Sequence, residues 1–250
     1  MISQTKRFIE RCLRRAGYEI RKLPSGGQTG SPHSEVRPLA TYSPWLADAE
    51  FSRVYDAIKA HTLVDIYRCY DLWQLVAESA KAPRGELLEV GVWRGGTGAL
   101  IASRCKQLHI DATVYLCDTF SGVVKAGSKD SAYSGGEHAD TSTQLVAGLL
   151  ERLEVSNCKL LEGVFPEQTG HVVHDRVFRF CHIDVDVYQS AKDVSDWAWP
   201  RLVHGGIVVY DDYGFASCEG VTRLVEEQRG YPDRVTLHNL NGHAVVVKVA

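Results

Sequence analysis

Short apolar runs alternate with amphipathic segments along most of this 250-residue chain. The apolar runs predict strands near residues 86–91, 112–117, 158–161, 177–183 and 206–210. Segments with helical spacing predict helices near residues 46–61, 66–81, 96–107, 141–153, 188–202 and 217–228. Two further runs, at 235–238 and 244–249, predict an antiparallel edge. We therefore expect an α/β fold with a doubly wound, mostly parallel seven-stranded sheet that is covered on both faces.

The first 45 residues differ from the rest of the chain. Residues 1–22 carry seven basic and two acidic side chains, and their apolar residues share one helical stripe. This predicts a basic amphipathic helix, which either lies on a membrane surface or packs against the domain or a second subunit. Residues 24–45 are rich in Pro and Gly, which is typical of a linker. We expect a helical extension at 1–23, a linker at 24–45 and one domain at 46–250.

Composition narrows the classes of function. The net charge is −3, with 28 basic and 31 acidic residues, so no basic field favours nucleic acid as a partner. The seven cysteines are scattered without a CxxC pair, which suits a reducing cytosol. No apolar run approaches the roughly 20 residues that a membrane span needs. We expect a cytoplasmic protein, peripheral to the inner membrane face if residues 1–22 bind lipid.

Carboxylates follow two of the predicted strands. Asp184 and Asp186 come after the run ending at Ile183, and Asp211 and Asp212 follow the run ending at Tyr210. Parallel strands end at the same edge of a sheet, where open α/β folds bind ligands. Acids gathered there would repel one another unless a hard divalent cation, held by oxygen ligands, joined them. The pattern therefore predicts a cation site at this edge of the sheet, formed by three or all four of these carboxylates.

A glycine-rich turn follows the first predicted strand. Gly91 permits a tight turn. Gly95 and the glycine after it allow a ligand to approach the backbone near the start of the next helix. The dinucleotide fingerprint GxGxxG is not met. Asp118 ends the next strand, where an acid accepts hydrogen bonds from ribose hydroxyls. Glu89 beside the turn disfavours a pyrophosphate and favours a cationic ligand, which points to S-adenosylmethionine (SAM).

Four stretches of the sequence resemble the macrocin O-methyltransferase (TylF/MycF) family. They are LLEVGVWRGG, CDTFSG, HIDVDVYQSAKDV and RLVHGGIVVYDDYG, in matching order and spacing over roughly residues 60–250. Members of this family are SAM- and Mg²⁺-dependent sugar O-methyltransferases that act on natural-product glycosides. The resemblance thus implies a Rossmann-like class I methyltransferase fold and a glycoside or saccharide acceptor. It also suggests a homodimer.

The resemblance assigns roles to individual residues. It implies that the methionine end of SAM is lined by Glu89, Gly91, Trp93, Arg94 and Gly95. Asp118 would bind the ribose, and Ser121 and Gly122 would border the nucleoside. Asp184, Asp211 and Asp212 would hold Mg²⁺, and two neighbouring acceptor hydroxyls would complete the metal shell.

The proton acceptor is less defined. Mg²⁺ lowers the pKa of a bound hydroxyl, and Asp184 is the first candidate to take its proton. The lysine that catechol-type relatives carry three residues after the first metal aspartate is Val187 here. The polar, Gly-rich segment 119–139 is expected to be a mobile lid over the substrate. It contains His138, which is either a second candidate base or an exposed loop histidine without a catalytic role.

Two other functions stay open. Related cephalosporin-hydroxylase-like proteins keep the same sheet and carboxylates, although this sequence shows no two-histidine, one-carboxylate pattern for an iron oxygenase. A non-enzymatic SAM-binding scaffold could instead dock through residues 1–22. His182, inside a predicted strand, is expected to be a hydrogen-bonded core histidine.

Overall fold

The computed structural model describes residues 9, 12–13, 15, 33, 36 and 40–250. The chain divides into two units, residues 1–38 and 39–250, and the second unit holds the fold described below. Most of the predicted helix at 1–23 and most of the predicted linker at 24–45 lie outside the described residues.

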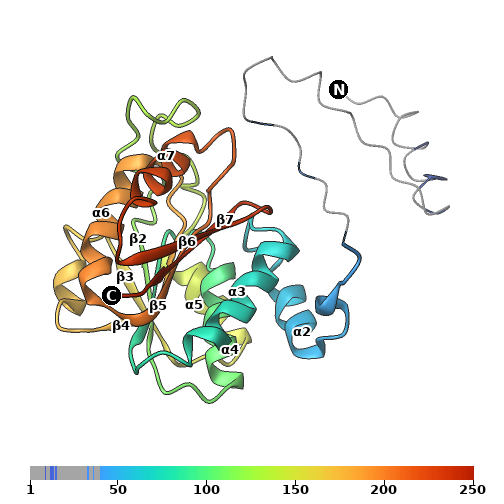
Figure 1. The fold of residues 1–250 in the computed structure, drawn as a ribbon. Helices are drawn as coiled ribbons and strands as arrows, with labels where there is room; N and C mark the ends of the chain where they lie inside the picture. The colour runs from blue at the N-terminus through green and yellow to red at the C-terminus, as the bar shows by residue number, and fades with distance from the viewer. Residues whose placement is uncertain (1–8, 10–11, 14, 16–32, 34–35, 37–39) are drawn as a thin grey trace. The chain divides into compact units, whose positions relative to one another are not determined.

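A seven-stranded sheet forms the centre of the second unit (Figure 1). Its strands are β1 (Glu86–Val90), β2 (Val114–Asp118), β3 (Cys158–Glu162), β4 (Phe178–Ile183), β5 (Leu202–Tyr210), β6 (Arg234–Asn239) and β7 (His243–Lys248). They lie in the order β3-β2-β1-β4-β5-β7-β6. The first five strands along the chain are parallel, whereas β7 runs antiparallel to β5 and to β6. The predicted sheet, including its antiparallel edge, is confirmed.

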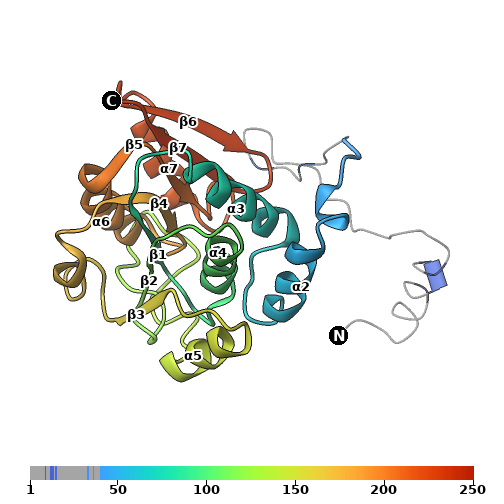
Figure 2. The same ribbon diagram turned by 90° about the horizontal axis from the view of Figure 1, so that it is seen from below.

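Helices cover both faces of this sheet (Figures 1 and 2). One core packs α2 (Ala49–Ile58), α3 (Ile66–Ser79), α4 (Gly96–Gln107) and α5 (Thr143–Arg152) against one face. A second core packs α6 (Tyr188–Ala198) and α7 (Glu219–Gln228) against the other. Short 3₁₀ helices are η1 (Pro44–Leu46), η2 (Gly170–Val173) and η3 (Trp199–Arg201). The doubly wound arrangement places the carboxyl ends of the parallel strands at one edge.

Local sequence explains where the helices begin. The side chain of Asp65 accepts hydrogen bonds from the backbone of Tyr67 and Arg68, so it caps α3. Ser142 caps α5 in the same way through Leu145. These caps fix the start of each helix relative to the strand ends that precede or follow it.

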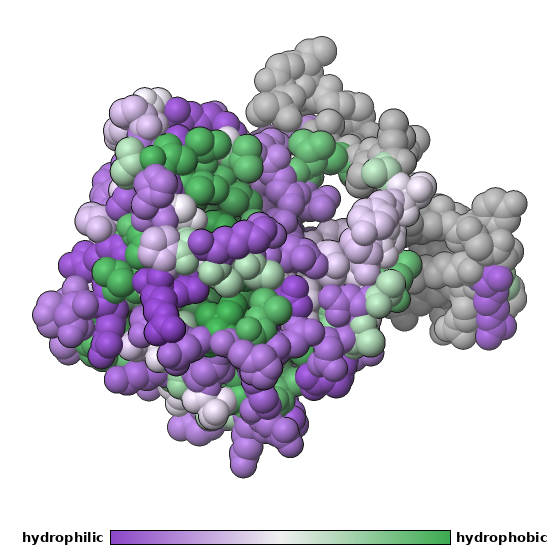
Figure 3. All heavy atoms as spheres, turned by 60° about the horizontal axis from the view of Figure 1, so that its bottom comes forward, coloured by the Kyte–Doolittle hydropathy of each residue, from purple (hydrophilic) through white to green (hydrophobic). Residues whose placement is uncertain are grey.

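The surface of the second unit carries scattered apolar side chains. On the face in Figure 3, apolar residues are exposed in patches between polar ones. Large exposed examples in the described part of the chain are Tyr42, Leu46, Leu63 and Leu240. No helix among the described residues is long and apolar enough to cross a membrane.

Candidate active site

A cavity of about 270 Å³ opens at the carboxyl ends of β1, β2, β4 and β5. Residues from all four strand ends and from the loop after β2 line it. Among the predicted site residues, the lining contains Gly91, Trp93, Asp118, Gly122, His138, Asp184, Asp211 and Asp212. The cavity therefore brings the glycine turn and the strand-end carboxylates together.

The glycine turn is shaped by Gly91 and Asp118. Gly91 has φ +90°, and a Cβ at this position would overlap the backbone carbonyl of Asp184. Asp118 Oδ2 accepts hydrogen bonds from the backbone nitrogens of Val92 at 2.6 Å and Trp93 at 2.8 Å. Its Oδ1 accepts one from Phe120 N at 2.7 Å. Asp118 thus holds the turn as well as lining the cavity.

Glu89 is not among the residues that line the cavity. Its side chain is fully buried, and Oε1 lies 2.9 Å from His182 Nδ1. It faces α4, where Gly98 leaves room, since a Cβ on Gly98 would lie 2.5 Å from Glu89 Oε2. The carboxylate that we expected beside the methionine end therefore belongs to a buried pair with His182. The expected core role of His182 agrees with this contact.

Three other expected cofactor residues are also outside the cavity lining. Arg94 forms an ion pair with Asp140. Gly95 has φ +87° and caps α4, where a Cβ would lie 2.8 Å from Val146 Cγ1. Ser121 is exposed, and its backbone nitrogen donates to Thr119 Oγ1 at 3.2 Å. These residues shape the walls of the turn and the following loop.

The three predicted metal carboxylates converge at the floor of the cavity. One oxygen each from Asp184, Asp211 and Asp212 lies within 4.8 Å of the others. Burial and the charges of Asp211 and Asp212 raise the pKa of Asp184 well above its usual value. Burial and the charges of Asp186 and Asp211 do the same to the pKa of Asp212. Such crowding of like charges is what a bound cation relieves, and an all-oxygen donor set fits a hard divalent ion.

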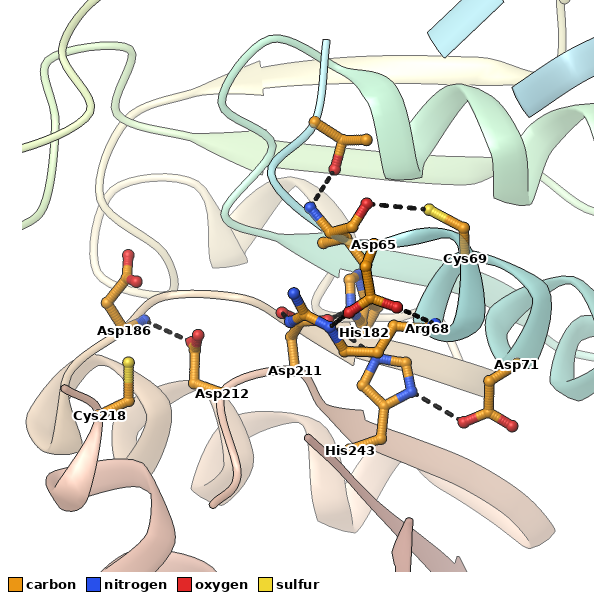
Figure 4. Close-up of polar contacts among 12 residues, drawn as sticks. Asp65, Arg68, Cys69, Asp71, His182, Asp186, Asp211, Asp212, Cys218 and His243 are labelled. Atoms are coloured by element: carbon orange, nitrogen blue, oxygen red, sulfur yellow. Dashed lines mark hydrogen bonds and ion pairs between the residues drawn. The ribbon is translucent and has the colours of Figure 1, made fainter. Parts of the chain in front are cut away.

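Asp211 behaves differently because cationic side chains surround it (Figure 4). It forms a buried ion pair with Arg68 and accepts from His243 Nε2 at 2.8 Å. Although burial opposes it, contacts with His182, His243 and Arg68 hold the pKa of Asp211 far below its usual value. Sequence reasoning missed Arg68 and His243. Arg68 lies one helical turn before the apolar Leu72, and a basic residue at such a position is a signal that some acid must meet it.

Two histidines lie beside Asp211, which the sequence spacing did not predict. Nitrogens of His182 and His243 and an oxygen of Asp211 lie within 4.8 Å of one another. This is the two-histidine, one-carboxylate composition that we expected to be absent. However, hydrogen bonds engage His182 Nδ1 and both nitrogens of His243, and neither ring lines the cavity. Although burial opposes it, the carboxylates of Asp211 and Glu89 raise the pKa of His182 to about 10. The trio is therefore a charged hydrogen-bonded network, which does not fit an open iron site.

Asp186 also reaches the cavity. The strand ends at Ile183, and Asp186 has φ +64°. Its backbone nitrogen donates to Asp212 Oδ2 at 3.0 Å, and Tyr133 donates from its hydroxyl to Asp186 Oδ1 at 2.5 Å. Burial raises the pKa of Asp186, whereas the hydrogen bond from Tyr133 opposes the shift. Asp186 is thus joined to the metal carboxylates and to the loop above them.

The loop after β2 forms one wall of the cavity and is anchored at several points. Asp130 is buried and accepts the backbone N–H of Tyr188 at 2.8 Å, at the start of α6. Ser190 donates to Val124 O at 2.8 Å. His138 lines the cavity, with its ring centroid 6.1 Å from that of Trp93. These anchors hold the loop against α6 and the glycine turn.

Comparisons with known proteins agree with this fold. A family model described as Macrocin-O-methyltransferase (TylF) matches residues 54–245. The chain is 26% identical over 219 residues to mycinamicin III 3''-O-methyltransferase from Micromonospora griseorubida, covering 81% of this chain and 84% of that protein. It is 26% identical over 190 residues to 8-demethyl-8-(2,3-dimethoxy-alpha-L-rhamnosyl)-tetracenomycin-C 4'-O-methyltransferase from Streptomyces olivaceus, covering 71% and 72%. The solved structure of the O-methyltransferase NovP superposes with a TM-score of 0.63 at 24% identity, covering 76% of this chain and 82% of that one.

Proposed function

Because this chain belongs to the macrocin O-methyltransferase (TylF) family, we propose that it methylates a hydroxyl of a sugar or glycoside, using SAM and Mg²⁺. The chain is an O-methyltransferase with a class I fold. The observation that carries the finer proposal is one cavity in which the glycine turn and Asp118 meet three carboxylates.

SAM fits the half of the cavity beside the glycine turn. Gly91 lacks a side chain there, so a ligand approaches bare backbone, and Trp93 adds an aromatic wall. Asp118 and Gly122 line the part next to the end of β2, where an acid would accept ribose hydroxyls. Glu89, Arg94, Gly95 and Ser121 would act by shaping the turn and the loop. When bound, SAM supplies a methyl group on a positively charged sulfur.

Asp184, Asp211 and Asp212 are the proposed ligands of Mg²⁺. Their crowded carboxylates and the raised pKa values of Asp184 and Asp212 support a cation there. A magnesium ion in this place would lower the pKa of an acceptor hydroxyl. Two neighbouring hydroxyls of the acceptor would complete its shell.

The side chains of this protein would then position the acceptor and move its proton. Asp184 is the proposed base, because it lines the cavity and lies at the carboxylate cluster. His138, on the loop wall, is the alternative base. Methyl transfer is an in-line displacement whose rate depends on the orientation of the acceptor oxygen. The anchored loop after β2 would supply that orientation and exclude water.

The acceptor is proposed to be a glycoside of a small natural product or a saccharide of a surface polymer. By their names, one relative methylates mycinamicin III at the 3''-oxygen, and another methylates a rhamnosyl tetracenomycin C at the 4'-oxygen. The expected dimer, and membrane contact through residues 1–22 of a cytoplasmic enzyme, remain predictions.

The proposal is tested by transfer of labelled methyl from SAM to a panel of glycosides. Asp184→Asn and Asp212→Asn should each lose more than about 100-fold in kcat while binding S-adenosylhomocysteine (SAH) normally. Asp175→Asn is the matched control, because Asp175 is at the surface, pairs with Arg176 and does not line the cavity. Full activity of both site variants would reject the carboxylate mechanism, and loss in the control would show that the substitution itself is harmful.

A further inference from the structure

Asp211 is held more firmly than the two other carboxylates of the cluster. Its Oδ1 accepts from His243 Nε2 at 2.8 Å and its Oδ2 accepts from Arg68 (Figure 4). By contrast, the hydrogen bond found for the Asp212 carboxylate comes from the backbone of Asp186. Among the described residues, no hydrogen bond reaches the Asp184 carboxylate. Asp211 is therefore the fixed member of the three.

His243 is fixed in turn by Asp71. Its Nδ1 lies 2.8 Å from Asp71 Oδ2, and the ring is fully buried. Each ring nitrogen thus faces a carboxylate oxygen, which accepts hydrogen bonds in its ionised form but does not donate them. Turning the ring would replace both nitrogens by carbons at these positions and break both contacts, so the orientation of the ring is fixed.

Helix α3 reaches Asp211 by two routes. Arg68 contacts Asp211 directly, and Asp71, three residues later on the same helix face, acts through His243. Asp71 Oδ2 also accepts from Asn239 Nδ2 at 2.8 Å, at the end of β6. The helix, β7 and the end of β5 are thereby joined around one carboxylate.

We propose that Asp71 is a positioning residue that, through His243, orients the Asp211 carboxylate toward the cation site. This inference rests on the proposed function, since it takes Asp184, Asp211 and Asp212 as the cation ligands. Three carboxylates without hydrogen-bond partners would move apart because they repel one another. Asp211, which is held by His243 and Arg68, keeps one ligand in place before the cation binds. Hydrogen bonds from residues behind a metal ligand orient it, and losing one weakens metal affinity by about 10–100-fold.

The test measures Mn²⁺ binding to the full-length protein by electron paramagnetic resonance, with Mg²⁺ as competitor. Asp71→Ala should weaken Mn²⁺ binding about tenfold, and Asp71→Asn, which keeps an acceptor oxygen for His243, should recover most of the affinity. Asn239→Ala is the matched control, because it removes the other hydrogen bond of Asp71 and leaves its contact with His243. SAH affinity and the melting temperature without metal are measured in parallel, and SAH affinity should not change.

The outcomes separate the two proposals. If the unaltered protein binds no Mn²⁺, the proposed metal site fails and this inference fails with it. If the unaltered protein binds Mn²⁺ and Asp71→Ala binds it equally well, the positioning role alone is wrong. An equal loss of Mn²⁺ affinity and of metal-free stability in Asp71→Ala and Asn239→Ala would also overturn it, because both would then act by holding the fold.

Discussion

Replacing Asp118 by Asn should destabilise the protein although the side chains have the same shape. The carboxylate accepts three backbone hydrogen bonds, from Val92, Trp93 and Phe120. An amide keeps one oxygen, which can serve Val92 and Trp93, but its NH₂ group then faces the N–H of Phe120. One charge-assisted bond, about 1.5–3 kcal/mol, is lost, and the two others become neutral. The expected cost is about 3 kcal/mol, or about 6–12 °C in Tm for a domain of this size.

Asp140→Asn provides the matched comparison. Asp140 contacts the same turn through Trp93 Nε1 at 2.8 Å and Arg94, but its side chain is 62% exposed. Because solvent screens an exposed ion pair, the loss of Asp140 should cost much less stability than the loss of Asp118. Urea unfolding followed by tryptophan fluorescence measures both variants, and SAH titration reports the turn itself. An Asp118→Asn variant within 1 kcal/mol of the unaltered protein, or an equal loss in Asp140→Asn, would refute the reasoning.

Three further predictions concern the glycine turn, a helix glycine and pH. Gly91→Ala should abolish SAH binding, measured by calorimetry, because its Cβ would displace the Asp184 carbonyl; normal binding would contradict this. Gly98→Ala should lower the free energy of unfolding by about 1–3 kcal/mol, measured in urea, although Ala favours helices, because the methyl group would crowd Glu89; a stabilised variant would show that the core adapts. The rise in Tm on adding Mg²⁺ should grow from pH 5 to pH 8. Because the pKa values of Asp184 and Asp212 are raised, protons compete with the cation for these carboxylates at low pH. In the metal-free protein, protonation of the two groups stabilises the fold, and this stability is lost as the pH rises. A rise in Tm that is independent of pH would count against these two ligands.

The order of strands and helices could be predicted because each element has its own local signal. Apolar runs mark the buried strands, and helical spacing marks the segments between them. Boundaries were less predictable. The helix expected at 188–202 ends at Ala198, because the next residues form a 3₁₀ helix that contains Pro200. Strand β5 begins at Leu202, before the apolar run from which the strand was predicted. Tertiary pairing with β4 extends that strand beyond what its sequence indicates.

The strand-end carboxylates could be predicted because parallel strands end at the same edge. Sequence does not reveal which face a strand residue meets when both faces are buried. Glu89 faces α4 and pairs with His182, 93 positions away, which its sequence does not indicate, and its contact with SAM stays a prediction. Arg68 and His243 were missed because their partner Asp211 is 143 and 32 positions from them along the chain. Nothing in the local pattern specifies such partners.

The most direct test of the account is methyl transfer from SAM to a glycoside with two adjacent hydroxyls, measured with Mg²⁺, with excess chelator, and with Mg²⁺ restored. A deoxy analogue that lacks the neighbouring hydroxyl serves as the control acceptor. We predict transfer to oxygen that is lost with chelator, returns with Mg²⁺ and is much slower with the deoxy analogue. Undiminished transfer in chelator to both acceptors would contradict the proposed role of Asp184, Asp211 and Asp212.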